Sequence, residues 1–406
     1  MLKRIMAVGL TLSFILILAS GCSSRRELND MAIASAIAID KRPDGFLVTI
    51  QVVDPGEVSS QKGGSGNAAV TIYQEKGKTV GEALRRVSVK APRRIYLAHL
   101  QMLVISDRLA KKGLGKILDL FFRAPDFRSD FLIVVAKSIE AQQLLKITTP
   151  IDKIPGGNMF KALTSSENIW APLTTVKIQQ LVTDLVSEGK NPILTGITVT
   201  NKNNKAKLEK ANSTANIQEI HKDSRFIYKG LAVFKKDKLI GWLNEEESSG
   251  YNYITDNVFQ TSESLVCPNK KGSLLATLTK SSTKIKVLFQ NHRPKIKVQV
   301  QAKGRISEID CQDVDLTNPH TISLIEALTE QAIKQKIKKT VQTVQRKYDS
   351  DIFGFGSSIY AYQPKAWMTL KKNWNQTFKV LPVDVNVHVT IERTGKFGKS
   401  FINDIK

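Results

Sequence analysis

The cysteines are the residues in this sequence most suited to covalent chemistry. Cys22 follows an apolar stretch at residues 5–18 and three small residues, and a charged segment comes after it. Small side chains let an extended backbone enter a peptidase cleft, and the thiol of the next residue can then carry a diacylglycerol. We therefore predict that Cys22 becomes the first residue of the mature chain, as an S-diacylglycerol and N-acyl (palmitate-type) cysteine.

The residues before Cys22 are organised like a signal peptide, which we place at residues 1–21. Lys3 and Arg4 form a short positive region ahead of the apolar stretch. That stretch is shorter than the about 20 apolar residues of a transmembrane helix, and it suits a signal-peptide core. With Cys22 it resembles a lipobox, although Ala19 stands where lipoboxes usually have leucine. The alternative is an ordinary secretory signal beside an incidental cysteine.

Two acyl chains are enough for stable anchoring, and no later segment reaches 18 consecutive apolar residues. The rest of the chain is therefore expected to form a body tethered to the outer face of a membrane. Cys267 and Cys311 remain, and an oxidising compartment would allow one disulfide between them. On the chain-entropy model it would stabilise the fold by roughly 3–4 kcal/mol. The alternative is two unpaired core residues.

Other residue types that could catalyse a reaction or bind a metal are scattered. The histidines have no ligand spacing to one another or to a cysteine; they are His99, His221, His292, His320 and His388. We interpret the glycine-rich stretches at 113–116 and 354–358 as turns, because neither has the form of a phosphate loop. The acidic run at 245–247 is typical of a helix N-terminus. We predict no catalytic, metal or cofactor site, although a triad assembled in space leaves no spacing signal.

The formal net charge of +23 limits the choice of partners. For a tethered protein it suits anionic lipid or acidic protein surfaces. Nucleic acid is the other common partner of basic proteins. We exclude it because exported lipoproteins rarely meet nucleic acid and because the aromatic residues do not cluster among the basic ones.

Hydrophobic periodicity indicates a mixed first half. It predicts strands at 31–40, 46–53, 70–75, 100–106, 131–136 and 193–200, and helices from Thr79, over 107–122 and within 150–190. Strands alternating with helices indicate an α/β or α+β module. Residues 201–214 are polar and basic, which predicts a long exposed loop or a domain linker.

The second half shows clearer patterns. A hairpin is predicted at 226–243, and strict alternation predicts strands at 295–302 and 383–392 in mixed or antiparallel sheets. A long helix is predicted over 319–348, with Asn318 as N-cap and Pro319 at the first position. Its apolar stripe is Ile325, Leu328, Ala332, Ile337, Val341 and Val344. Its basic residues, interpreted as a solvated face, are Lys334, Lys336, Lys338, Lys339, Arg346 and Lys347.

Several motifs in order carry a family resemblance. They are RELNDMAIASAIAIDK (26–41), EALRRVSVKAPRRIYLAHLQMLVIS (82–106), GLAVFKKDKLIGWLNEEESSG (230–250), LTNPH (316–320) and the long stretch DIFGFGSSIYAYQPKAWMTLKKNWNQTFKVLPVDVNVHVTIERTG (351–395). Together with the lipobox they resemble the Ger(x)C lipoproteins, the C subunits of spore germinant receptors. Members often carry tryptophan after the lipidated cysteine, whereas this chain has Ser23.

The resemblance implies a non-enzymatic subunit on the outer surface of the spore inner membrane, held by Cys22. Its partners would be the integral-membrane A and B subunits, with contact to the nutrient germinant left open. The expected domains are an N-terminal α/β domain at 22–200 and a C-terminal α+β domain at 221–406, joined by a linker or exposed loop at 201–220. Composition alone also allows a substrate-binding lipoprotein of a transporter, although the sequence shows no doubled βαβ pattern. A lipid-anchored hydrolase is a third possibility.

Overall fold

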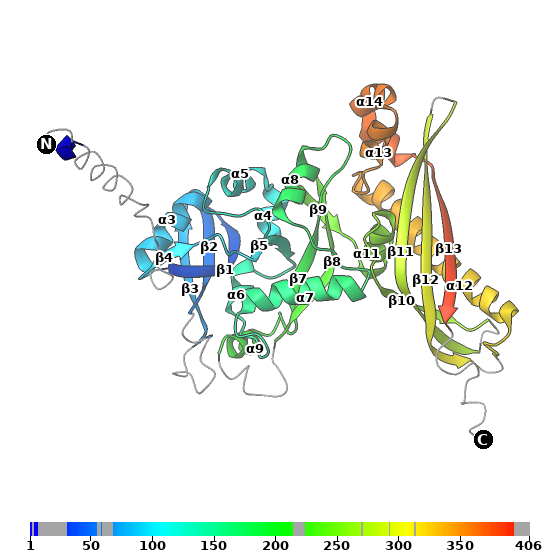
Figure 1. Cartoon of the computed structure of the whole chain (residues 1–406), viewed down its shortest axis with the longest axis horizontal. Coiled ribbons are helices and arrows are strands. Elements are labelled where there is room, and N and C mark those ends of the chain that lie inside the picture. The colour runs from blue at the N-terminus through cyan, green and yellow to red at the C-terminus, as the bar shows by residue number, and fades with distance from the viewer. Residues whose placement is uncertain are drawn as a thin grey trace, which may run out of the picture.

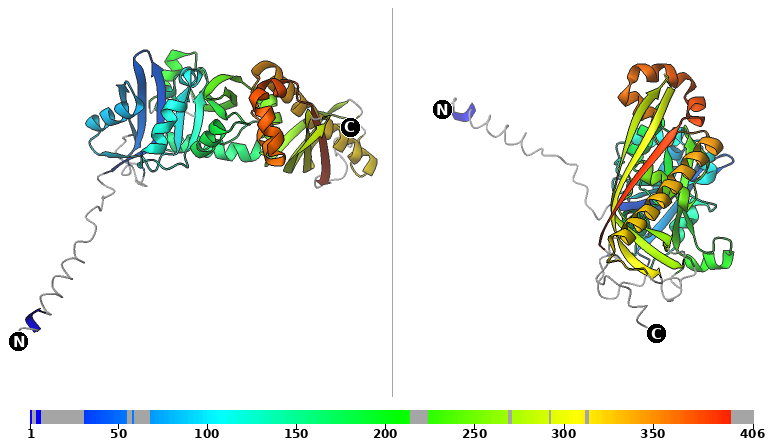
Figure 2. Two further views of the ribbon diagram at one scale, coloured as in Figure 1. Left: turned by 90° about the horizontal axis from the view of Figure 1, so that it is seen from above. Right: turned by 90° about the vertical axis from the view of Figure 1, so that its right-hand side faces the viewer.

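The computed structural model shows an elongated body built on two β-sheets. It describes residues 1, 4–6, 31–54, 58, 68–213, 224–268, 271–291, 293–311 and 314–393. The second sheet lies at one end of the long axis, and the first fills the other end and the middle (Figures 1 and 2). No helix in these ranges is long and apolar enough to cross a membrane. The predicted fold class, mixed α+β with flanking helices and a long helix near the C-terminus, is confirmed.

The first sheet combines antiparallel outer strands with parallel central ones. Within the described ranges its strands are β1 (Met31–Arg42), β2 (Gly45–Val53), β3 (Val70–Gly77), β4 (Arg94–Tyr96), β5 (Met102–Ser106), β6 (Leu132–Ala136), β7 (Ile193–Val199), β8 (Phe226–Lys235) and β9 (Lys238–Trp242). Their order is β3-β2-β1-β5-β6-β7-β8-β9, and the short β4 pairs with β1 off this path. The pairs between β1, β5, β6 and β7 are parallel. The hairpin β8–β9 continues this sheet beyond the predicted linker, because β8 pairs with β7.

Strand β1 shows how the alternating sequence produces two buried faces. Ile37 and Ile39 enter one hydrophobic cluster, and Ala36 and Ala38 enter a second cluster on the other face. A bulge between Ala34 and Ala36 shifts the register, so Ala34 joins the isoleucines instead of the other alanines. Period-two alternation continues only while the ladder is regular, and a bulge resets it.

Helices cover both faces of the first sheet. They are α3 (Val80–Lys90), α4 (Asp107–Lys112), α5 (Gly115–Arg123), α6 (Ala141–Lys146), α7 (Pro155–Ile169), α8 (Ile178–Val186) and α9 (Lys205–Ala211). Buried residues of α3, α4, α5 and α8 belong to one cluster, and those of α6 and α7 to the other. Thr79 caps α3 as predicted, because its hydroxyl accepts the backbone N–H of Glu82.

Two predicted segments differ from the structure. The single helix expected over 107–122 is two helices, because Gly113 has φ 116°, which an α-helix does not accommodate. The loop or linker expected at 201–214 contains α9. Ala211 of this helix is buried and Leu208 packs against the core, so two apolar residues in a polar stretch are enough to dock it.

The second sheet has the order β10-β11-β12-β13. Its strands are β10 (Thr261–Val266), β11 (Gly272–Gln290), β12 (Arg293–Cys311) and β13 (Val383–Arg393). The helical segments of this half are α11 (Glu245–Ile254), α12 (Pro319–Thr343), the π-helical turn η2 (Val344–Tyr348), α13 (Phe355–Tyr362), α14 (Pro364–Leu370), the 3₁₀ turn η3 (Lys371–Asn373) and α15 (Trp374–Lys379). β11 pairs antiparallel with β10 and β12, and β13 joins β12 in parallel.

Helix α12 covers one face of this sheet and passes behind the strands in Figure 1. Asn318 accepts the backbone N–H of His320 and Pro319 takes the first turn, as the sequence predicts. Buried Ile325, Ile333 and Ile337 share one core with the inward-facing residues of β12. Of the predicted stripe, Leu328 and Ala332 are only partly buried, whereas Thr329 is fully buried.

The free edge of β13 is covered by two carboxylates of α12. Glu330 accepts the backbone N–H of Val389 at 3.0 Å, and Glu326 accepts that of Ile391 at 2.8 Å. Unpaired N–H groups at a sheet edge are a template for pairing with another chain. Here the two carboxylates accept these N–H groups, so this part of the edge is not available for pairing with another chain.

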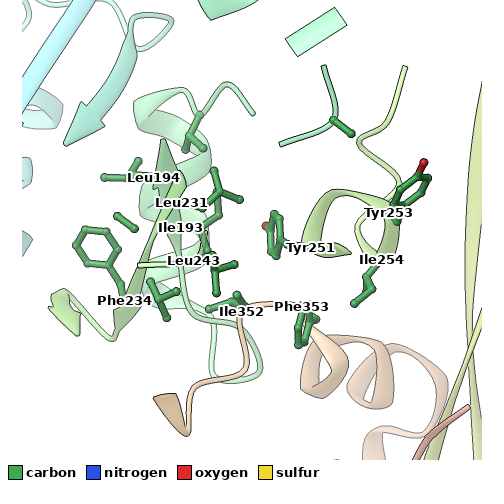
Figure 3. Packing of buried hydrophobic residues seen from close by; sticks show 14 of the residues in the cluster. Ile193, Leu194, Leu231, Phe234, Leu243, Tyr251, Tyr253, Ile254, Ile352 and Phe353 are labelled. Atoms are coloured by element: carbon green, nitrogen blue, oxygen red, sulfur yellow. The ribbon is translucent and has the colours of Figure 1, made fainter. Parts of the chain in front are cut away.

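One hydrophobic core runs through the junction between the sheets. Figure 3 shows Leu243, which directly follows β9, next to Ile352, with Phe234 of β8 on one side of this pair and Phe353, together with Tyr251 of α11, on the other. All of these side chains are buried. The two sheets are therefore packed together instead of being separated by an open hinge.

Candidate functional site

The residues that the sequence singled out do not assemble into a reaction centre. Cys22 lies outside the described residues, as do His221 and His292. His99 contacts the ring of Tyr96 edge to face, and His388 is exposed with Nδ1 3.3 Å from a carboxylate oxygen of Glu330. In the described part of the chain, no group of three or more His, Cys, Asp or Glu side chains is placed to hold a metal ion.

The structure places Cys267 and Cys311 in a disulfide, with their Cα atoms 5.7 Å apart. Cys267 follows the last residue of β10, and Cys311 is the last residue of β12. The bond therefore links the two strands that flank β11 at one end of the second sheet.

The stretch 354–358 forms the N-terminus of α13, with Gly354 as N-cap, and backbone N–H groups in this position can bind an anion. A carboxylate of the chain itself already occupies them. Asp351 accepts the backbone N–H groups of Phe353, Gly354 and Phe355 on Oδ1 and that of Gly356 on Oδ2, at 2.8–3.2 Å. The indole N–H of Trp374 also donates to Oδ2. This helix N-terminus is therefore closed to a phosphate.

Asp351 also lies where the two halves of the chain meet. Its backbone carbonyl accepts the N–H of Asn191, and the N–H of Ser357 donates to the carbonyl of Gly189. A Cβ added at Gly189 would lie 2.4 Å from the Ser357 nitrogen, so only glycine allows this approach. Burial raises the pKa of Asp351 to about 6, against the effect of its hydrogen-bond donors. We interpret Asp351 as a structural residue that holds the two halves of the chain together.

The open face of the second sheet has an unusual concentration of positive charge. We call Lys284, Lys286, Lys295 and Lys297 the lysine face. Lys286 on β11 lies directly opposite Lys297 on β12, a pairing of like charges that costs about 0.2–1 kcal/mol. Lys295 forms an ion pair with Asp384 at 2.7 Å. The other three lysines form no ion pair with any carboxylate in the described ranges.

A polar hollow of about 530 Å³ continues the lysine face toward α12. Gln299, which lies opposite Lys284, lines it together with Asn386 and His388 of β13. Lys334 of α12 lines it from the other side. A cationic surface beside a polar hollow is complementary to an acidic protein segment.

The basic residues of α12 are only partly the solvated face that the sequence predicted. Lys336 forms an ion pair with buried Glu263, which also accepts the hydroxyl of Tyr253. Lys339 forms an ion pair with Glu246 of α11. These two lysines hold α12 onto its neighbours. Lys334 and Lys338 of the same helix stay exposed and form no ion pair with a carboxylate of the described chain.

The alternation of β12 is visible in the sequence, but the lysine face is not. Residue spacing gives one strand's outward face, whereas the juxtaposition of Lys286 and Lys297 depends on which strands pair and in which register. The sequence does show four lysines within residues 284–297, which is a signal for a basic surface but does not give their arrangement.

Comparison with known proteins gives the family. The family model described as spore germination protein N-terminal domain matches residues 24–199, and that described as spore germination B3/GerAC like, C-terminal, matches 229–395. The chain is 32% identical to spore germination protein KC of Bacillus subtilis (strain 168), over 97% of this chain and 96% of that protein. It is 27% identical to putative spore germination protein YfkR of the same organism, over 95% and 96%.

A solved structure has the same fold. The crystal structure of the GerBC protein superposes with a TM-score of 0.54 at 18% identity, covering 88% of this chain and 96% of that one. The family models cover both halves and the relative KC spans nearly the whole length, so the resemblance seen in the sequence motifs is confirmed. The chain belongs to the Ger(x)C family of spore germination proteins, the C subunits of germinant receptors.

Proposed function

We propose that this chain is a lipid-anchored, non-enzymatic scaffold of a nutrient germinant receptor. Diacylated Cys22 holds it at the outer surface of the spore inner membrane, where it supports the integral-membrane A and B subunits. Anchoring confines the body to a thin layer beside those subunits and raises its effective concentration there without any new contact. The proposed units are the signal peptide 1–21, 22–200, the connection 201–220 and 221–406.

The observation that carries the proposal is the lysine face. Three of its four lysines have no acidic partner in the described chain, and two of them face each other at a cost in stability. An acidic surface on a membrane subunit would relieve that repulsion and provide a specific contact. The junction between the sheets supports the same conclusion, because a packed core suits a scaffold better than a protein that closes around a ligand.

A tagged chain recovered from dormant-spore membranes in mild detergent tests the proposal. We expect two polytopic membrane proteins to co-elute with the wild type, and we expect Lys286→Glu with Lys297→Glu to reduce their recovery at least tenfold. The matched control is Lys365→Glu with Lys372→Glu, two exposed lysines on α14 and η3. It changes the net charge equally and should leave recovery unchanged.

The same experiment separates the alternatives. Recovery of a permease and an ATPase would instead indicate a transporter's substrate-binding lipoprotein. Equal loss in both double variants would show that total charge matters and not the lysine face. Cys22→Ala should release the chain from the membrane fraction and weaken assembly; full membrane retention and germination at the wild-type rate would contradict the anchoring proposal.

A further inference from the structure

A second basic surface lies at the opposite end of the body from the second sheet. It consists of Arg85, Arg86 and Lys90 on α3 together with Arg93 and Arg94 after it, and we call these five residues the basic strip. All five are exposed. No acidic residue occurs between positions 83 and 94.

Much of this charge is available to a partner. Arg86 pairs with Glu82, Lys90 with Glu75, and Arg94 approaches Asp126 at 3.9 Å. All three basic side chains remain about 60% exposed in these pairs. Arg85 and Arg93 have no ion pair with a carboxylate of the described chain. The strip therefore keeps an excess of positive charge at its surface.

The strip lies beside the point where the described body begins. β4 pairs in parallel with the start of β1, with Met31 opposite Arg94. Neighbouring strands are about 4.8 Å apart, so Arg94 is adjacent to the first residue of β1. Figure 1 shows α3 and β4 together at this end of the body, far from β11–β13.

The length of chain before Met31 limits how far this end can be from the membrane. Eight residues separate Cys22 from Met31. At about 3.3–3.6 Å per residue, even a fully extended segment places Met31 within roughly 30 Å of the lipidated sulfur. Given the proposed lipidation of Cys22, on which this inference rests, the end that carries the basic strip is the end held near the bilayer.

We propose that the basic strip lies against the anionic headgroups of the bilayer that holds Cys22. Cationic side chains close to an anionic leaflet are attracted within about one Debye length of its surface. Val89 stands among them and is 87% exposed, and an interface with the headgroup layer accounts for an apolar residue in that position. The contact fixes which end of the elongated body faces the membrane, leaving the lysine face available to protein partners.

The test uses the full lipidated chain reconstituted into vesicles of phosphatidylcholine, with or without 30% phosphatidylglycerol, a fraction chosen at about the anionic content of a bacterial membrane. The variant Val89→Cys carries an environment-sensitive fluorophore, and Val380→Cys, which is 78% exposed in the second half, is the matched control probe. We expect a blue-shifted signal at position 89 only with phosphatidylglycerol, reversed by high salt. The probe at position 380 should show the emission of a water-exposed fluorophore under all conditions.

Charge variants made with the Val89 probe complete the test. At about fivefold per basic residue near an anionic surface, Arg85→Gln with Arg93→Gln should lower the docked-to-undocked ratio on the order of 25-fold. Lys365→Gln with Lys372→Gln removes the same charge elsewhere and should leave the ratio unchanged.

The outcomes separate this proposal from the one on which it rests. If the chain does not float with vesicles of either composition, the anchoring proposal fails and the docking proposal fails with it. If it floats with both but the probe at position 89 still reports water with phosphatidylglycerol, anchoring stands and docking of the basic strip is overturned. Equal signals in the two lipid mixtures would also overturn it, because the contact would then not depend on charge.

Discussion

Replacing Asp351 by asparagine tests whether one buried carboxylate holds the junction of the two sheets. The side chain is 1% exposed and accepts hydrogen bonds from four backbone N–H groups and the indole of Trp374. Asparagine has nearly the same volume but only one acceptor oxygen. In the better of its two orientations, its amide nitrogen meets the N–H of Gly356 and the indole N–H.

At least two buried donors therefore lose their acceptor. Each unsatisfied buried group costs about 1–3 kcal/mol, so we expect the free energy of unfolding to fall by about 3 kcal/mol at pH 7, where the Asp351 side chain is ionised. The loss should be seen in urea unfolding followed by tryptophan fluorescence, to which Trp374 contributes directly. Asp119→Asn, at an exposed ion pair on α5, is the matched control and should cost less than 1 kcal/mol.

The pH dependence has a definite sign. Burial raises the pKa of Asp351 to about 6 from an ordinary value of 3.8. Between these values the folded chain holds the proton more tightly than the unfolded chain, so wild-type stability falls as pH rises through this range and the loss is complete above 6. Asparagine does not titrate. The stability gap between wild type and Asp351→Asn should therefore be about 1 kcal/mol larger at pH 5 than at pH 7.

A gap that grows with rising pH would refute this reasoning. It would mean that the five donors lower the pKa of the carboxyl by more than burial raises it. A loss no greater than that of Asp119→Asn would refute the structural role itself.

Three further predictions concern other parts of the chain. Cys267→Ala with Cys311→Ala should lower the free energy of unfolding by about 3–4 kcal/mol, and free thiols at these positions in the native wild type would contradict the disulfide. Lys297→Glu alone should raise the free energy of unfolding by about 0.5 kcal/mol, because it removes the repulsion with Lys286, yet it should lower the recovery of the membrane subunits. A gain in both stability and recovery would argue against docking at this face. Glu140→Gln should cost about 1 kcal/mol at pH 7, allowing for its exposure, because an arginine partner lowers the pKa of Glu140 to about 2. That contribution is present above about pH 4.5 and is lost as pH falls toward 2, so wild type and Glu140→Gln should converge in acid.

Local sequence signals predicted the elements that depend on local physics. The alternation of β12 and β13 identified both strands, and Asn318 with Pro319 marked the start of α12 within one residue. These succeed because side-chain period and capping act over a few neighbouring residues. Gly113 shows the limit. Whether glycine interrupts a helix or is tolerated in it depends on what packs nearby, and here the turn of β8–β9 supplies Asp237 as a hydrogen-bond partner for the next helix.

The candidate site depends on contacts between segments far apart in the sequence. Strand pairing places Lys286 opposite Lys297, and the parallel addition of β13 to β12 joins segments separated by all of α12. The carboxylate that fills the glycine-rich turn comes from three residues earlier, but its indole donor comes from α15. None of these pairings has a signature in residue spacing, which explains why the sequence identified the strands and not the surface they form.

The packed junction also bears on how such a subunit could act. Separating the sheets would expose Phe234, Tyr251 and Phe353, and apolar surface costs about 25 cal/mol for each Å² exposed to water. A hinge that opens and closes around a nutrient uses an interface that is easily parted. This junction is instead buried and crossed by hydrogen bonds on both sides of Asp351. A body of this kind would move as one unit, so a membrane subunit that displaced the lysine face would also displace the end that carries the basic strip.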